Sequence, residues 1–202
     1  MSNTIITISR EFGSGGRQFA RKLAEKLGYD YYDKQILQQI AEHTELSEAY
    51  IKSVVDRKPH SLLPISMGTS FSSGLDYPMQ QMQTIYSAQF EIIEKMAAES
   101  NCVIVGRCAD YILRKQNPFR IMVYANMDYK VQRCLKNRKE GEPDNEADIQ
   151  KWIKKLDRAR AQYYNNFTGQ EWGDKEYFDL CINMANKDVD QMVDMVAGMF
   201  QK

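Results

Sequence analysis

The sequence lacks the features that mark metal-binding, membrane-spanning and nucleic-acid-binding proteins. Its four cysteines show no C-x-x-C pairing, and its two histidines stand far from them, so we expect no structural zinc site. No apolar run approaches the ~18 residues of a membrane span. The 27 basic and 27 acidic residues cancel, so no global positive field exists to hold a nucleic acid or an anionic membrane. The cysteines are Cys102, Cys108, Cys134 and Cys181, and the histidines are His43 and His60.

The start of the chain also lacks a basic segment followed by a long apolar run, so we expect no signal peptide and a cytoplasmic protein. In that compartment the cysteines should remain free thiols. Cys108 follows a Gly-Arg pair, but no base lies near it in the sequence, so we expect no catalytic thiol. The 202 residues, 43% of them hydrophobic, suffice for one α/β domain with one sizeable core.

Strand-like and helix-like patterns alternate along the chain, which predicts a doubly wound parallel sheet with helices on both faces. Between about residues 58 and 78 no consistent period is present, and we expect a long loop there, within an insertion between the second and third strands. The predicted strands are 4–9, 29–32, 102–105, 121–124 and 178–183. The predicted helices are 17–27, a segment from 33, and about 79–99, 128–139, 146–166 and 189–201.

A glycine-rich segment, REFGSGGRQ, joins the first predicted strand to the first predicted helix. Glycines in this context let backbone N–H groups converge on a phosphate, and the helix N-terminus adds its dipole. A tight turn between strand and helix needs one or two glycines, whereas this one has three within four residues, which favours phosphate binding. The candidate phosphate-binding residues are Arg10, Gly13, Ser14, Gly15, Gly16, Arg17 and Gln18.

The loop departs from the usual phosphate-loop sequence, G-x-x-x-x-G-K-[ST]. In one register Gly16 takes the lysine position and Arg17 the hydroxyl position; in the next, Arg17 and Gln18 take them. Either way the loop lacks the lysine that binds the β- and γ-phosphates and the hydroxyl that binds Mg²⁺. The positive charge must then come from Arg17, Arg10 or elsewhere, and arginine is not geometrically interchangeable with lysine.

Several strings resemble the cytidylate-kinase-like family, a branch of the nucleoside-monophosphate kinases in which S-R-x-x-G-S-G-G-R replaces the ordinary phosphate loop. These are SREFGSGGRQFA with LGYDYYDKQIL, then VGRCADYIL, DRARAQYY and YFDLCINM, so the resemblance covers nearly the whole chain. It implies one P-loop NTPase-like, three-layer α/β/α domain over 1–202 with five parallel strands. A helical acceptor-binding insertion at about 34–98 and a lid region at about 138–172 are also implied.

The resemblance implies ATP-dependent phosphoryl transfer to a nucleoside monophosphate, most closely cytidylate, with Mg²⁺ held largely by phosphates and water. The partners would then be small nucleotides, with no nucleic acid and no membrane. Two other functions stay open. The acceptor could be another small metabolite, because a fold does not fix a substrate. The missing lysine also allows a nucleotide-binding sensor that has lost turnover.

Two residues are candidates for acceptor binding. Arg107 ends the third predicted strand, at the sheet edge where open α/β folds bind ligands. The resemblance makes it the acceptor-phosphate arginine, and a surface arginine in a turn is the alternative. Asp33 follows the second predicted strand, where it could cap a helix, face the acceptor, or do both.

The catalytic candidates are arginines, because cations stabilise the charge that spreads over the transferred phosphoryl group. Asp157 and Arg160 have a D-x-x-R spacing that puts them on adjacent turns of one helix face, as in the lid arginines of the resembled family. We select Arg17, Arg158 and Arg160. Arg133 is a further candidate, for which a solvated role on its helix is the alternative.

Overall fold

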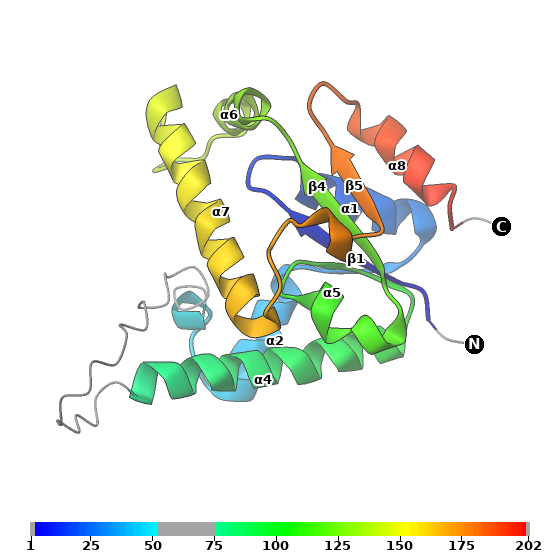
Figure 1. The fold of residues 1–202 in the computed structure, drawn as a ribbon, viewed down its shortest axis with the longest axis vertical. Helices are drawn as coiled ribbons and strands as arrows, with labels where there is room; N and C mark the ends of the chain where they lie inside the picture. Colours follow the sequence, from blue (N-terminus) through cyan, green and yellow to red (C-terminus); the bar gives the residue numbers. More distant parts are fainter. Residues whose placement is uncertain (1–2, 52–75, 201–202) are drawn as a thin grey trace.

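The computed structural model describes residues 3–51 and 76–200 of the chain. Its centre is a five-stranded sheet in the order β2-β3-β1-β4-β5, and all four strand pairs are parallel. Helices lie on both faces of this sheet (Figure 1). The strands are β1 (Ile5–Arg10), β2 (Asp30–Tyr32), β3 (Cys102–Val105), β4 (Phe119–Tyr124) and β5 (Leu180–Asn183). The helices are α1 (Gly16–Leu27), α2 (Lys34–Thr44), α4 (Asp76–Glu99), α5 (Ala109–Ile112), α6 (Met127–Lys136), α7 (Glu146–Thr168) and α8 (Val189–Ala197), with short 3-10 turns η1 (Arg114–Gln116) and η2 (Lys175–Tyr177).

The alternation of side chains along the strands divides the core into two layers. Val103 and Val105 of β3 face a cluster that contains residues of α1 and α8. Cys102 and Ile104 of the same strand face the opposite cluster, which contains residues of α2, α4, α5 and α7. A third, smaller cluster packs Val131 of α6 against α7. Both faces of the sheet are therefore covered, as expected of an all-parallel sheet.

The predicted α/β fold is confirmed. The five predicted strand segments form the five strands, and the β-branched run before the glycines forms β1 at the centre of the sheet. The predicted loop at 58–78 lies outside the described residues except for its last three positions, which already belong to α4. No described helix combines the length and the apolar composition that crossing a membrane requires.

The carboxyl ends of the three central strands meet at one edge of the sheet. The glycine loop leaves β1 there, the turn at Gly106 leaves β3, and the segment at Ala125 leaves β4. The backbone N–H of Glu11 donates to the carbonyl oxygen of Val123 over 3.0 Å, which fixes the start of the loop to β4. Ligands of open α/β folds bind at this edge, and the candidate residues of the glycine loop and of the turn after β3 lie there.

Candidate functional site

The loop between β1 and α1 is built on two glycines in the left-handed conformation. Gly13 has a φ of 79° and Gly15 a φ of 89°, values that other residues adopt only at an energetic cost. Ser14 between them is fully buried. Its hydroxyl donates to the carbonyl oxygen of Glu11 over 2.9 Å and accepts from the N–H of Gly16 over 3.3 Å. The side chain of Ser14 therefore braces the loop from inside.

Several backbone N–H groups of this loop are open. Helix α1 begins after Gly15 without a side-chain cap. Within the described part of the chain, the N–H groups of Gly13, Gly15 and Arg17 have no hydrogen-bond acceptor. Unpaired N–H groups at a helix N-terminus carry the positive end of the helix dipole and form a site for anions. The predicted phosphate site thus has the donors it needs.

Arg10 extends from the end of β1 into the gap between the loop and β3. A Cβ added at Gly16 would lie 2.6 Å from the Cβ of Arg10, and one added at Gly106 would lie 1.9 Å from its Nη1. Gly16 therefore leaves room for the stem of this side chain, and a Cβ at Gly106 would displace its guanidinium end. Burial is the main cause that lowers the pKa of Arg10 to about 9. The charges of Arg160, Arg107 and Arg17 contribute to the decrease, and the charge of Asp33 opposes it. The guanidinium stays charged at neutral pH, but its charge is poorly compensated.

Four arginines share this electrostatic environment, and carboxylates compensate only two of them. Arg17 pairs with Asp33 through Nε–Oδ2 at 2.7 Å, and its Nη2 donates to Oδ1 over 3.3 Å. Nη1 of Arg160 lies 3.2 Å from Oδ1 of Asp157 and also donates to the carbonyl oxygen of Arg10 over 3.2 Å. Neither Arg10 nor the fourth arginine, at position 107, forms a salt bridge with a described residue. The edge of the sheet thus holds an excess of positive charge that suits a polyanion.

Asp33 occupies the N-cap position of α2, but its side chain forms no capping hydrogen bond. Its carboxylate faces Arg17 instead, and its backbone N–H donates to Oε1 of Gln35 over 3.2 Å. The capping function that the sequence left open for this side chain is therefore absent. Burial is the main cause that raises the pKa of Tyr31 to about 12, and the neighbouring carboxylate of Asp33 adds to it.

A buried lysine that the sequence analysis did not select lies beneath the loop. Lys130 is 5% exposed, and its Nζ lies 3.0 Å from Oε2 of Glu11 and 3.4 Å from Oδ2 of Asp157. Asp157 also accepts from the backbone N–H of Phe12 over 2.7 Å. This network connects α6 and α7 to the glycine loop. Burial raises the pKa of Asp157, while the N–H of Phe12 and the nearby cations oppose the shift.

The position of Lys130 in α6 gave a signal that went unused. It lies between Met127 and Cys134 at helical spacing, next to Val131, so the lysine falls on the apolar stripe of the helix. A charged residue on an apolar stripe is buried only with partners. Its partner Glu11 is likewise a loop residue that the sequence analysis passed over.

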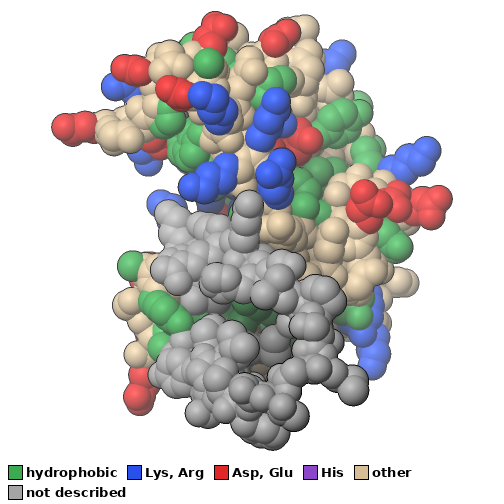
Figure 2. Space-filling view, turned by 60° about the vertical axis from the view of Figure 1, so that its left-hand side comes forward, with side chains coloured by type: hydrophobic (Ala, Val, Ile, Leu, Met, Phe, Trp, Pro, Cys, Tyr) green, Lys and Arg blue, Asp and Glu red, His purple; other side chains and the backbone are tan. Residues whose placement is uncertain are grey.

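The remaining arginine candidates differ in their placement. Nη2 of Arg133 donates to Oε1 of Gln18 over 2.7 Å, and a Cβ at Gly15 would lie 3.5 Å from the guanidinium carbon, so Arg133 lies over the loop. Arg158 is exposed on α7 and is not brought to the loop with Arg160. Figure 2 shows Lys and Arg side chains gathered near the middle of the face on which α7 lies.

The turn after β3 has an unusual backbone. Gly106, Arg107 and Cys108 have φ values of 71°, 59° and 54°, so three successive residues are left-handed. Each non-glycine residue in this conformation costs about 1–2 kcal/mol. Cys108 is buried, and burial raises the pKa of its thiol, which is consistent with the expectation that it is not a nucleophile. Gln89 of α4, fully buried, donates to the carbonyl oxygen of Arg107 over 2.8 Å.

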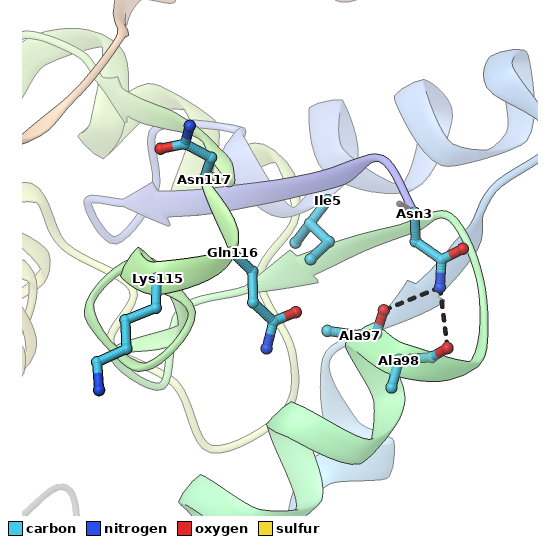
Figure 3. A pocket seen from close by; sticks show the side chains of 7 residues that line it. All are labelled: Asn3, Ile5, Ala97, Ala98, Lys115, Gln116 and Asn117. Carbon is cyan, nitrogen blue, oxygen red and sulfur yellow. Dashed lines mark hydrogen bonds between the residues drawn. The ribbon is translucent and has the colours of Figure 1, made fainter. Parts of the chain in front are cut away.

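A cavity of about 500 Å³ lies elsewhere, at the amino ends of the strands (Figure 3). Its walls come from the start of β1, the end of α4 and the segment before β4, and the amide of Asn3 in its wall donates to the carbonyl oxygens of Ala97 and Ala98. Lys115 is its one charged lining residue, so it offers no convergent charge for a phosphate. Among the described residues there is no group of three or more His, Cys, Asp or Glu that could hold a metal ion.

Comparison with known proteins supports the fold. The cytidylate kinase-like family matches residues 5–186. No curated protein matches the chain. Among solved structures, an uncharacterized protein from Eubacterium ventriosum is 30% identical, with 98% of each chain covered and a TM-score of 0.70. Shikimate kinase from Bacteroides thetaiotaomicron is 13% identical, with 98% of each chain covered and a TM-score of 0.56. Shikimate kinase from Acinetobacter baumannii, solved with shikimate, is 14% identical, covers 98% of this chain and 94% of its own, and has a TM-score of 0.52.

Proposed function

The chain belongs to the cytidylate kinase-like family, and on this premise we propose that it transfers the terminal phosphoryl group of ATP to a nucleoside monophosphate. One observation carries the proposal. Two kinds of phosphate-binding group meet at one edge of the sheet. They are the open backbone amides of the glycine loop and two arginines, Arg10 and Arg107, that form no salt bridge with a described residue. Phosphoryl transfer brings two phosphate-bearing substrates together, and such an edge compensates their combined negative charge.

The donor phosphates would lie over the N–H groups of Gly13, Gly15 and Arg17, with Arg133 on the outer side of the loop. Arg17 would take the role of the missing lysine through its guanidinium. Mg²⁺ fits this site as an ion held by phosphates and water, because the hydroxyl of Ser14 is occupied inside the loop. When bound, the ion would neutralise part of the negative charge of the donor phosphates.

The acceptor phosphate would bind to Arg107, with Asp33 and the helical insertion at about 34–98 on the acceptor side. Arg160 of the lid region at about 138–172 would stabilise the charge that develops on the transferred group. Asp157 supports this function because it holds Arg160 while accepting from the N–H of Phe12, so lid and loop share one carboxylate. We also propose a cytoplasmic location, since ATP is available there and all four cysteines are free thiols.

A second candidate, a nucleotide-binding sensor without turnover, is favoured by one observation. The only buried lysine near the loop, among the described residues, is engaged by Glu11 and Asp157, so it does not replace the phosphate-loop lysine. A kinase for a different small metabolite is the other alternative, and it would use the same donor site.

Initial-rate measurements of ADP formation with ATP and Mg²⁺ test the proposal, with CMP, dCMP, UMP, AMP and GMP as separate acceptors. We expect ADP formation that depends on one monophosphate, with a higher KM for that acceptor in Arg107→Ala. Arg114→Ala is the matched control, because that arginine is exposed and donates only to the nearby carbonyl oxygen of Tyr111. ATP binding by calorimetry without transfer to any acceptor would identify the sensor instead, and transfer only to a metabolite without a nucleotide would identify the other kinase.

A further inference from the structure

A buried glutamine, Gln89, joins the turn that carries Arg107 to two helices. Its Nε2 donates to the carbonyl oxygen of Arg107 over 2.8 Å, and its Oε1 accepts from the hydroxyl of Tyr163 over 3.1 Å. Gln89 belongs to α4, Tyr163 to α7 and Arg107 to the turn after β3. Both the glutamine and the tyrosine are buried, so no bulk water competes for these hydrogen bonds.

The turn needs support from outside because its own conformation is unfavourable. Arg107 and Cys108 are both left-handed without being glycine, and such a conformation persists only where the surrounding structure holds it. The neighbouring carbonyl groups of the turn bond to α5, since the N–H of Ala109 donates to Gly106 and the N–H of Ile112 donates to Cys108. The carbonyl group of Arg107 points elsewhere and is held by the glutamine.

Tyr163 brings this link next to the arginine of the lid region. It lies three residues after Arg160 on α7, which places the two on adjacent turns of one helix. The rings of Tyr86 on α4 and Phe167 on α7 stack with centroids 4.1 Å apart, so the two helices are in direct contact beside the link. The backbone of Arg107 is thereby fixed relative to the helix that carries Arg160.

We propose that Gln89 is a positioning residue for the acceptor phosphate. It holds the Arg107 turn in its left-handed conformation and, through Tyr163, sets Arg107 relative to Arg160. The inference rests on the proposed transfer to a monophosphate, in which Arg107 binds the acceptor. Gln89 itself touches neither substrate and acts only through the backbone carbonyl group of Arg107. A purely structural glutamine would contribute to stability and leave substrate binding unchanged.

Three variants separate a positioning function of Gln89 from a purely structural one. Gln89→Met keeps the side-chain volume and removes both hydrogen bonds. Tyr163→Phe removes one and leaves the bond from Gln89 to Arg107. Tyr164→Phe is the control, because it removes the hydroxyl of another buried tyrosine of α7, which lies 2.6 Å from Oδ2 of Asp110 and 3.0 Å from Oε1 of Gln170.

Initial-rate kinetics and thermal unfolding are measured on all three. We expect Gln89→Met to raise the KM for the monophosphate about tenfold, the effect of one weakened charge-assisted contact, with the KM for ATP unchanged. Tyr163→Phe should have a smaller effect of the same kind. Tyr164→Phe should lower the Tm and leave both KM values unchanged. A Gln89→Met variant that loses Tm with both KM values unchanged, or with both raised alike, overturns the proposal.

The crystal structure of Gln89→Met gives a readout that needs no substrate. We expect Arg107 to leave the left-handed conformation, and a turn identical to that of the wild type overturns the positioning function. If the wild type transfers phosphate to no monophosphate, the proposed function fails, and this comparison of backbones still decides what Gln89 does.

Discussion

Replacing Gly106 by alanine should move the guanidinium of Arg10 while leaving the fold in place. The new Cβ would lie 1.9 Å from Nη1 of Arg10, and only the far end of that side chain has to yield. The backbone contribution is separate: φ at Gly106 is 71°, and a left-handed alanine costs roughly 1–2 kcal/mol. For a chain of this length that cost lowers the Tm by about 2–8 °C.

Gly28→Ala provides a matched control for the backbone contribution. Its φ is 68°, and nothing lies within 4 Å of an added Cβ. Both variants should therefore lose similar stability in thermal unfolding. Only Gly106→Ala should reduce kcat/KM for phosphoryl transfer, by about tenfold or more if Arg10 contacts phosphate.

A double-mutant cycle isolates the contact with Arg10. In an Arg10→Ala background the clash disappears, so adding Gly106→Ala should reduce kcat/KM little further. If Gly106→Ala is as active as Gly28→Ala, or if its effect is the same with and without Arg10, the assignment of Arg10 to the phosphate site is wrong.

Three further predictions concern Arg17, Lys130 and Asp110. Arg17→Ala should reduce phosphoryl transfer on the order of 10²-fold with the fold intact, and unchanged transfer would show that this residue takes no part in catalysis. Partial rescue by Arg17→Lys would indicate that Arg17 acts as a point charge, and no rescue would indicate a bidentate contact. Lys130→Met should lower the free energy of unfolding in urea by about 3 kcal/mol, because it leaves Glu11 and Asp157 without their shared cation, and an unchanged value would contradict the network. Burial raises the pKa of Asp110. Between the ordinary and the raised pKa the folded state therefore binds more protons than the unfolded state, so the free energy of unfolding falls as pH rises through that interval. Asp110→Asn should reduce the slope of the free energy of unfolding against pH, which is at most about 1.4 kcal/mol per pH unit for one proton. An unchanged slope would show that Asp110 does not cause this pH dependence.

The sequence predicted those parts of the molecule that depend on local pattern. Apolar runs such as 102–105 are buried on both faces of a parallel sheet, so their composition alone identifies them as strands. The glycines of the loop were informative because Gly13 and Gly15 need left-handed backbone. The D-x-x-R spacing also predicted that Asp157 and Arg160 share a helix face, and the structure shows that they form an ion pair there.

Contacts between distant segments had no such local signal. Arg17 and Asp33 belong to different elements, and nothing in either segment indicated that they pair. Arg158 seemed equivalent to Arg160 by composition, but two residues along a helix turn the side chain about 200°, so only one of them can face Asp157. Gln89 and Lys130 lie on apolar stripes of their helices, which indicates that they are buried but not which groups they contact.

The separate KM values for ATP and for the nucleoside monophosphate in Arg107→Ala test the central claim most directly. In the proposed function the acceptor phosphate binds Arg107, in the turn after β3, whereas the donor phosphates bind the loop after β1. Loss of one charge-assisted contact should raise the acceptor KM by about tenfold or more and leave the KM for ATP unchanged. Equal increases in both values, or no change in either, would contradict a phosphotransferase whose acceptor phosphate binds at this arginine.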